Sequence, residues 1–287
     1  MLGRSGRESG AIARLAATLG GWRDEQDEDL LDLGTTSQAL MTIGSIDDLA
    51  AVLHIGHPSQ PAHSLEQRLL QAPASVMLTA AVAVPPSWAW VGRQTDARGT
   101  LVVDDAGIRD CRGTLRDLGV APHLVPSAMP VEQRLALAGP DGSLVIERSR
   151  IPSGYVELPG SALLPDEPVW YGLARAVRRG GERDVVVDGP SQVWLAFGPS
   201  DDHLGSLGES LRSVAGAGFD LQHLRSQRST AGLHVFYTSF ACADRSSLTA
   251  LLSEFDGRGV RHRVLAVLPG SSFLPGPDPV EPQWAAR

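Results

Sequence analysis

The sequence predicts a protein of the α/β class with a β-α-β-β-α-β module toward its C-terminus. Short apolar β runs alternate with helical patterns along most of the chain, which is typical of mainly parallel sheets covered by helices. The clearest stretch is residues 191–275, where alternating and helical periodicities follow one another in the order β-α-β-β-α-β. With 287 residues, the chain is long enough for two or three lobes with their own cores.

The first 20 residues indicate a short strand, a glycine-rich turn at residues 3–6 and a helix. Ser9 is a residue type that commonly caps a helix, and the apolar residues after it follow helical spacing. Backbone amides at such a helix start can hold a carboxylate. The alternative interpretation is a tight connection between a strand and a helix, without a ligand.

The middle of the chain predicts two further α/β units. The segments "LLDLGTTSQALMTI" and "DDLAAVLHIG" fit a strand, a helix and a second strand. "SVMLTAAVAV" is too short to cross a bilayer and predicts a buried strand. After Pro85 and Pro86 come "SWAWVGR", "GTLVVDD", the helix "GIRDCRGTLRDLGV", "HLVPS" and "GSLVIER", which form another alternating unit.

The C-terminal module is expected to contain four strands and two helices. Strands are expected at residues 193–197, 219–225, 233–242 and 261–268, and helices at 204–215 and 246–255. A break at residues 216–218 separates the first helix from the second strand.

Composition excludes several classes of function. The formal charge is -8, and all 25 basic residues are Arg, with no basic cluster beyond residues 175–183, so neither nucleic acid nor an anionic membrane is an expected partner. Without Lys, Schiff-base chemistry, pyridoxal phosphate anchoring and P-loop phosphate binding are excluded. Cys111 and Cys242 show no paired spacing and are expected to be buried, so no metal and no cofactor is expected. No signal-peptide pattern opens the sequence, so a cytoplasmic location is expected.

The order of elements in residues 191–275, with Gly218 opening the strand in "GAGFDLQHLRSQRS", resembles the ACT regulatory domain. The chain as a whole is similar to bacterial prephenate dehydratases. That resemblance implies a two-lobed, periplasmic-binding-protein-like domain followed by a ferredoxin-like βαββαβ ACT domain. It divides the chain into lobe 1 (1–75), lobe 2 (76–160), a return to lobe 1 with a linker (161–190), the ACT domain (191–275) and a tail (276–287).

The resemblance implies an effector site at Gly205, Ser206, Leu207, Arg225 and Ser226. In the family a Gly-Ala-Leu signature opens the first ACT helix and a strand carries Glu-Ser-Arg-Pro. In this chain the first signature corresponds to residues 205–208, Gly-Ser-Leu-Gly, and the second to residues 225–228, Arg-Ser-Gln-Arg. Arg225 thus stands where the family has an acidic residue. The changed charge predicts weak phenylalanine binding and a more anionic effector. The alternative is an ACT domain used only for dimerisation; a homodimer or tetramer is expected in either case.

The family's catalytic signatures are replaced. Its Thr-Arg-Phe motif, which supplies the acid that protonates the departing hydroxyl and an arginine that pairs with a carboxylate, corresponds to residues 169–171, Val-Trp-Tyr. The Glu-Asn-Ser, Ser-His-Pro and Ser-Ser-Thr places correspond to residues 56–58, 103–105 and 128–130. Loss of a positioned acid typically costs roughly 10²- to 10⁴-fold. An ordinary dehydratase is therefore not expected. The related prephenate decarboxylases keep the hydroxyl and need no acid there.

Five residues are predicted to face the interlobe cleft as the candidate catalytic set: Ser9, His57, Asp104, Trp170 and Tyr171. His54, His57 and His63 cluster in the sequence, although Pro58 and Pro61 also fit a merely exposed loop. The substrate would be prephenate or a similar small cyclic carboxylate. The alternatives are a catalytically inactive homologue that senses an aromatic metabolite or regulates a partner, and an unrelated reaction on the same scaffold.

Overall fold

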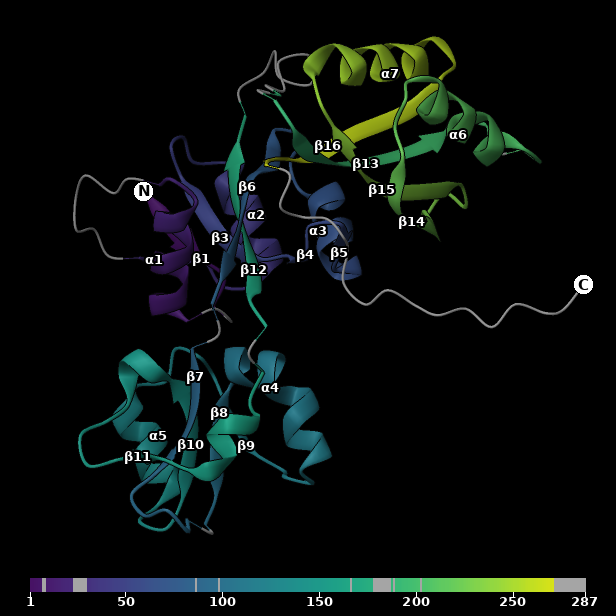
Figure 1. Cartoon of the computed structure of the whole chain (residues 1–287). Helices are drawn as coiled ribbons and strands as arrows, with labels where there is room; N and C mark the ends of the chain where they lie inside the picture. Colours follow the sequence, from purple (N-terminus) through teal and green to yellow (C-terminus); the bar gives the residue numbers. More distant parts are fainter. Residues whose placement is uncertain are drawn as a thin grey trace, which may run out of the picture.

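The computed structural model describes residues 1–6, 9–22, 30–85, 87–97, 99–165, 167–177, 187, 189–201 and 203–270. Over these residues the strands form a nine-stranded sheet, a five-stranded sheet and a small hairpin. Figure 1 shows the five-stranded sheet with its helices as a separate lobe at the bottom of the view. This mixed α/β architecture confirms the predicted fold class. None of the described helices is long and apolar enough to span a membrane.

The first lobe is built on parallel strands at one end of the nine-stranded sheet. β1 (Leu2–Arg4) lies between β2 (Leu31–Asp32) and β3 (Ala50–His54) and is parallel to both. Side chains of β3 alternate between the two faces. One face packs on α1, and the other packs on α2 and α3. These helices are α1 (Gly10–Leu19), α2 (Thr36–Ile43) and α3 (His63–Gln71).

Two long antiparallel strands complete the first lobe. β12 (Val169–Ala176) pairs with β3 on one side and with β6 (Val76–Val84) on the other. The sequence places the start of the second lobe at residue 76, whereas β6 lies within the nine-stranded sheet. Its apolar run is stable between two neighbouring strands, and the chain leaves the sheet only at Pro85, which has no N–H to donate. The lobe boundary therefore falls after β6.

The second lobe contains the five-stranded sheet. β8, β9 and β10 are parallel, whereas β7 runs antiparallel to β10 and to β11. The strands are β7 (Trp88–Gly92), β8 (Leu101–Asp104), β9 (His123–Val125), β10 (Ser143–Glu147) and β11 (Val156–Glu157). The helices are α4 (Asp105–Asp117) and α5 (Val131–Ala138), with short 3-10 turns at Arg148–Arg150 and Pro159–Leu163.

The C-terminal module has the predicted order of elements. Its four strands are arranged β14-β15-β13-β16 within the nine-stranded sheet. Both of its helices lie on one face of these strands (Figure 1). The elements are β13 (Ser191–Pro199), α6 (Ser206–Gly216), β14 (Leu221–Arg228), β15 (His234–Cys242), α7 (Arg245–Gly257) and β16 (Val260–Pro269). The tail predicted at 276–287 lies outside the described residues.

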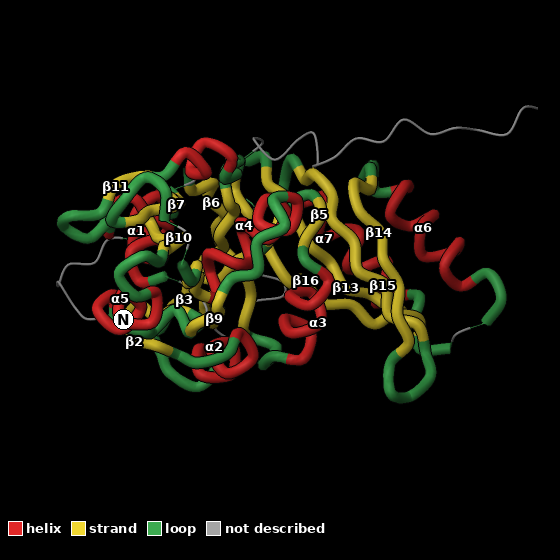
Figure 2. The backbone as a smooth tube through the Cα atoms, turned by 90° about the horizontal axis from the view of Figure 1, so that it is seen from below, coloured by secondary structure: helices red, strands yellow, loops and turns green. Residues whose placement is uncertain are grey.

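The opposite face of this ACT-like module packs on the first lobe. Figure 2 shows α3 beside β13 and β16, and β16 pairs with β6 through Ala266 and Leu78, so the sheet runs from one domain into the other. Arg263 of β16 donates to the carbonyls of residues 70, 72, 73 and 76, at the end of α3 and the start of β6. Glu66 of α3 is 1% exposed and accepts from Arg225 at 2.9 Å.

We expect Arg263→Ala to destabilise the folded chain by about 2–4 kcal/mol, because it removes charged hydrogen bonds to four carbonyls that are covered by the two domains. Arg261→Ala is the matched control, because Arg261 is exposed on the same strand. Urea unfolding measures both variants. Equal midpoints for the two variants would show that the contact adds nothing.

Candidate functional site

The interlobe edge is the edge of the nine-stranded sheet where the chain crosses between lobes. The carboxyl ends of the parallel strands β1 and β3 lie there, since Tyr171 near the start of β12 pairs with His54 at the end of β3. Val84, the last residue of β6, pairs with Val169, the first of β12, at the same edge. Ligands of α/β sheets bind outside the carboxyl ends of parallel strands. The side chains at this edge therefore form the candidate site.

Ser9 lies at this edge as the N-cap residue of α1. Its backbone is extended, but its side chain makes no capping hydrogen bond. The side chain is 1% exposed, and its Oγ has no hydrogen-bond partner among the described residues. A buried hydroxyl without a partner costs free energy. The N-terminal end of α1 adds a positive potential beside it. These groups suit an anion, and the placement of Ser9 at a ligand site stays a prediction.

Tyr171 and Arg109 connect the two lobes. The Tyr171 hydroxyl on β12 accepts a hydrogen bond of 2.8 Å from Nη2 of Arg109 on α4. The guanidinium carbon also lies 5.7 Å from the centre of the Tyr171 ring, which adds a cation–π contact. Tyr171 itself is 1% exposed, and Arg109 lies over its ring. The contact places a positive charge at the interlobe edge.

Asp110 and Trp88 hold Arg109 in place. Both Asp110 oxygens accept from the guanidinium, at 2.6 Å from Nε and 3.1 Å from Nη2. The same carboxylate accepts from Trp88 Nε1 at 3.0 Å. Arg109 and Asp110 were missed by the sequence analysis. A strand-to-helix segment gives no sign of which residues of its helix reach the opposite lobe.

His54 lies next to Tyr171, with ring centroids 6.0 Å apart. Burial, with a smaller contribution from the charge of Arg109, lowers the pKa of His54 to about 3. The imidazole is therefore neutral at physiological pH. Its protonation would place a second positive charge beside Arg109.

His57 and Trp170 lie together on the other face of the sheet. Successive residues of a strand point to opposite faces. Tyr171 packs with α1 and Trp88, whereas Trp170 packs on the core that contains α2 and α3. The His57 ring lies 5.7 Å from that of Trp170, and burial lowers the pKa of His57. The structure therefore separates His57 and Trp170 from Ser9 and Tyr171.

Pro58 and Pro61 suggest an exposed loop around His57, but the structure shows otherwise. Residues 56–61 form the hairpin of β4 (Gly56–His57) and β5 (Gln60–Pro61), and Pro58 and Pro61 are buried. Trp194 donates to the Pro58 carbonyl at 2.8 Å, and Ser239 donates to the Ser59 carbonyl at 2.6 Å. The hairpin is thus held by the ACT-like sheet.

Asp104 has a structural position instead of an exposed one. It is the N-cap residue of α4, where its Oδ1 accepts from the Gly107 amide at 2.8 Å. Its Oδ2 accepts from Arg134 at 2.7 Å, and both side chains are almost fully buried. A carboxylate with both oxygens engaged inside one lobe is poorly placed as an acid or base for a ligand between the lobes.

The predicted effector residues lie on separate elements. Gly205 precedes α6 with a left-handed backbone (φ 100°), and Ser206 and Leu207 open that helix. Arg225 and Ser226 are neighbours on β14 and point to opposite faces. Arg225 is bound to Glu66 of the first lobe, which also lies 3.1 Å from His223 Nε2. The structure thus gives Arg225 an interdomain contact in place of the expected exposure to an effector.

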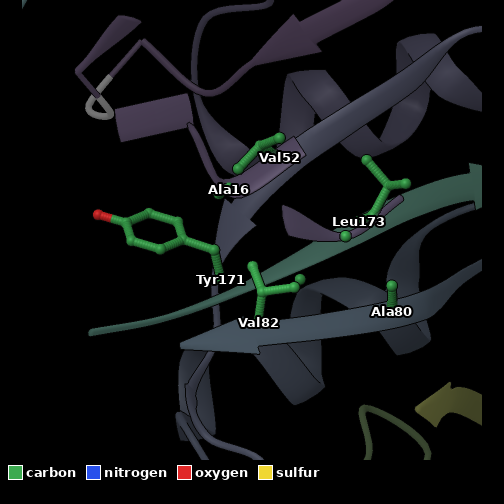
Figure 3. Close-up of a pocket in the computed structure, with 8 residues that line it drawn as sticks. Ala16, Val52, Ala80, Val82, Tyr171 and Leu173 are labelled. Carbon is green, nitrogen blue, oxygen red and sulfur yellow. The ribbon is translucent and has the colours of Figure 1, made fainter. Parts of the chain in front are cut away.

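Figure 3 shows a small pocket beside Tyr171, between α1 and the sheet. Its volume is about 10 Å³, room for at most one water molecule. Its lining includes Ala16, Val52, Val82 and Leu173, so it is an apolar packing gap. One hydrophobic cluster continues past it from α1 and β12 to Trp88 and α4, across both lobes.

The described residues offer no group of three His, Cys, Asp or Glu side chains arranged to hold a metal ion. Cys111 and Cys242 are free and buried, as predicted. Burial raises the pKa of Cys111 to about 12 and also raises the pKa of Cys242. Neither thiol is therefore a nucleophile at neutral pH.

No protein-family model and no curated protein matches the chain. Solved structures match nearly its full length. The prephenate dehydratase of Staphylococcus aureus subsp. aureus Mu50 has a TM-score of 0.66 at 12% identity, over 94% of this chain and 100% of that one. The prephenate dehydratase of Arthrobacter aurescens, in complex with L-Phe, has a TM-score of 0.68 at 15% identity, over 96% and 92%. GqqA, described as a novel type of quorum quenching acylase, has a TM-score of 0.63 at 15% identity, over 95% and 98%.

These comparisons confirm that the chain has the fold of prephenate dehydratases. The match to GqqA shows that a similar fold also occurs in a protein with a different named activity. Fold alone therefore leaves the reaction open.

We expect His54→Gln to flatten the acid dependence of stability. The folded-state pKa of His54, about 3, lies below its ordinary value of 6.5, so between these values the unfolded state binds more protons. The free energy of unfolding then falls as the pH drops below 6.5, by up to about 1.4 kcal/mol per pH unit from this residue. Urea unfolding at pH 7, 6 and 5 measures the slope. His123→Gln, at an exposed histidine, should keep the wild-type slope; a His54→Gln profile parallel to wild type would contradict the assignment.

Proposed function

We propose that the chain is a diverged homologue of the prephenate dehydratases that acts as a lyase on prephenate or a similar small cyclic carboxylate, in aromatic amino-acid or specialised metabolism. The observation that carries this proposal is the Arg109–Tyr171 contact between the lobes, at the edge of the sheet where Ser9 also begins α1. An unpaired buried hydroxyl, a helix N-terminus and a guanidinium are groups that bind a carboxylate.

Ordinary dehydration is disfavoured by the residues at the start of β12. Val169 has no proton to give to a departing hydroxyl, and Trp170 carries no charge and lies on the other face of the sheet from Tyr171. Decarboxylation has other requirements. The bond between the ring and its carboxyl carbon breaks, CO₂ leaves, the electron pair moves through the ring diene, and a ring carbon takes up a proton. The hydroxyl stays, so no acid is needed beside it.

A catalytically inactive homologue is the second candidate. One hydrophobic cluster runs through the junction between the lobes, and His54 is neutral and partly buried there. Such a protein would bind an aromatic metabolite or regulate a partner through its ACT-like module. The L-Phe held by the Arthrobacter aurescens relative supports a small-molecule ligand on this fold.

Incubation with prephenate tests the proposed function. We expect CO₂ release and a product that keeps the ring hydroxyl, with phenylpyruvate formed far more slowly than the roughly 10 turnovers per second of a typical enzyme. Mass spectrometry and the absorbance of the phenylpyruvate enol in base follow the two products. Phenylpyruvate formation at that typical rate would contradict the proposal. Tight binding of prephenate without any product would favour the inactive homologue.

We also propose a homodimer, or a tetramer built from it, held partly by residues 191–275. β14 is at the outer edge of the nine-stranded sheet, so its outer backbone groups are open to pairing among the described strands. Light scattering at micromolar concentration should give at least twice the chain mass. A mass of 30.4 kDa, that of one chain, would contradict this proposal.

A further inference from the structure

Arg109 is a side chain of the second lobe that contacts the first lobe at the interlobe edge. It comes from α4, and it makes both a hydrogen bond and a ring contact with Tyr171 of β12. Its side chain is 24% exposed, whereas Tyr171 is 1% exposed. A ligand that arrives from solvent therefore meets the guanidinium before it meets the phenol.

The guanidinium is fixed from two sides. Asp110 binds it through two oxygens, and this carboxylate is itself 5% exposed and held by Trp88. Tyr171 holds Nη2 from the other lobe. A planar guanidinium that is already oriented loses little conformational entropy when it binds a carboxylate. Arg109 is therefore preorganised to bind a carboxylate, whereas a flexible surface arginine would first have to be ordered.

The surroundings of Arg109 limit the ligand that fits. Asp110 balances the charge of Arg109, and His54 beside them is neutral at physiological pH, so the edge carries little excess positive charge. Trp88 and Tyr171 place aromatic rings next to the guanidinium. These features fit a carboxylate on a small unsaturated ring.

We infer that Arg109 is the residue that binds the ligand carboxylate at the interlobe edge, with Asp110 and Tyr171 as its positioning residues. The inference rests on the proposed function and adds the specificity-determining group to it.

Calorimetric titration of the full chain with prephenate and with phenylpyruvate tests the inference. Arg109→Gln should weaken binding of both by roughly 10- to 100-fold, the effect of losing a charged hydrogen bond. Arg109→Lys should give an intermediate affinity, because lysine keeps the charge but loses the planar group that Asp110 and Tyr171 hold in place. Arg112→Gln is the matched control, since Arg112 is exposed on the same helix, and should bind within about twofold of wild type.

The methyl ester of phenylpyruvate distinguishes loss of carboxylate recognition from general damage to the fold by the substitution. The ester should bind wild type weakly, and Arg109→Gln should weaken it no further. Tyr171→Phe keeps the charge of Arg109; it should weaken binding of phenylpyruvate and leave binding of the methyl ester unchanged. This variant provides the test if Arg109→Gln unfolds below the assay temperature. Wild-type binding with equal affinity in Arg109→Gln would overturn this inference alone. If wild type bound none of these probes, the proposed function would fail with it.

Discussion

The antiparallel pairing of β6 with β12 is the constraint on which the rest of the structure depends. One strand leads the chain out of the first lobe and the other brings it back, and their adjoining ends at Val84 and Val169 are paired. Both crossings therefore lie side by side, and the second lobe is attached at one place. This attachment brings Trp88 and α4 against Tyr171. Polar groups from distant parts of the sequence meet at the interlobe edge as a consequence.

The same strand, β6, also joins the ACT-like module to the first lobe. β16 pairs with it, and Arg263 binds carbonyls at its start and at the end of α3. The module also binds the hairpin of residues 56–61 through hydrogen bonds from Trp194 and Ser239. Since His57 of that hairpin packs on Trp170, the module contacts the strand that carries Tyr171 through one intermediate residue. The ACT-like module and the interlobe edge are therefore joined by a short series of direct contacts.

Local signals in the sequence were sufficient to predict the helices and strands but not to predict which residues form the candidate site. Period and capping residues located α1 behind Ser9 and the whole βαββαβ order, because these depend on neighbours along the chain. Strand alternation already implies that Trp170 and Tyr171 face opposite sides, and a strand-to-helix position already favours Asp104 as a cap. Arg109 and its contact with Tyr171 depend on how two lobes pack, which no local pattern records.

A double-mutant cycle on Arg109 and Tyr171 tests most directly that this pair acts as one unit across the lobes. The free energy of phenylpyruvate binding would be measured for wild type, Arg109→Gln, Tyr171→Phe and the double variant. Residues that share one interaction show coupling energies of about 0.5–3 kcal/mol, whereas independent residues add within about 0.5 kcal/mol. We expect a coupling of at least about 1 kcal/mol, because Tyr171 acts only by positioning Arg109. Additive losses would contradict it.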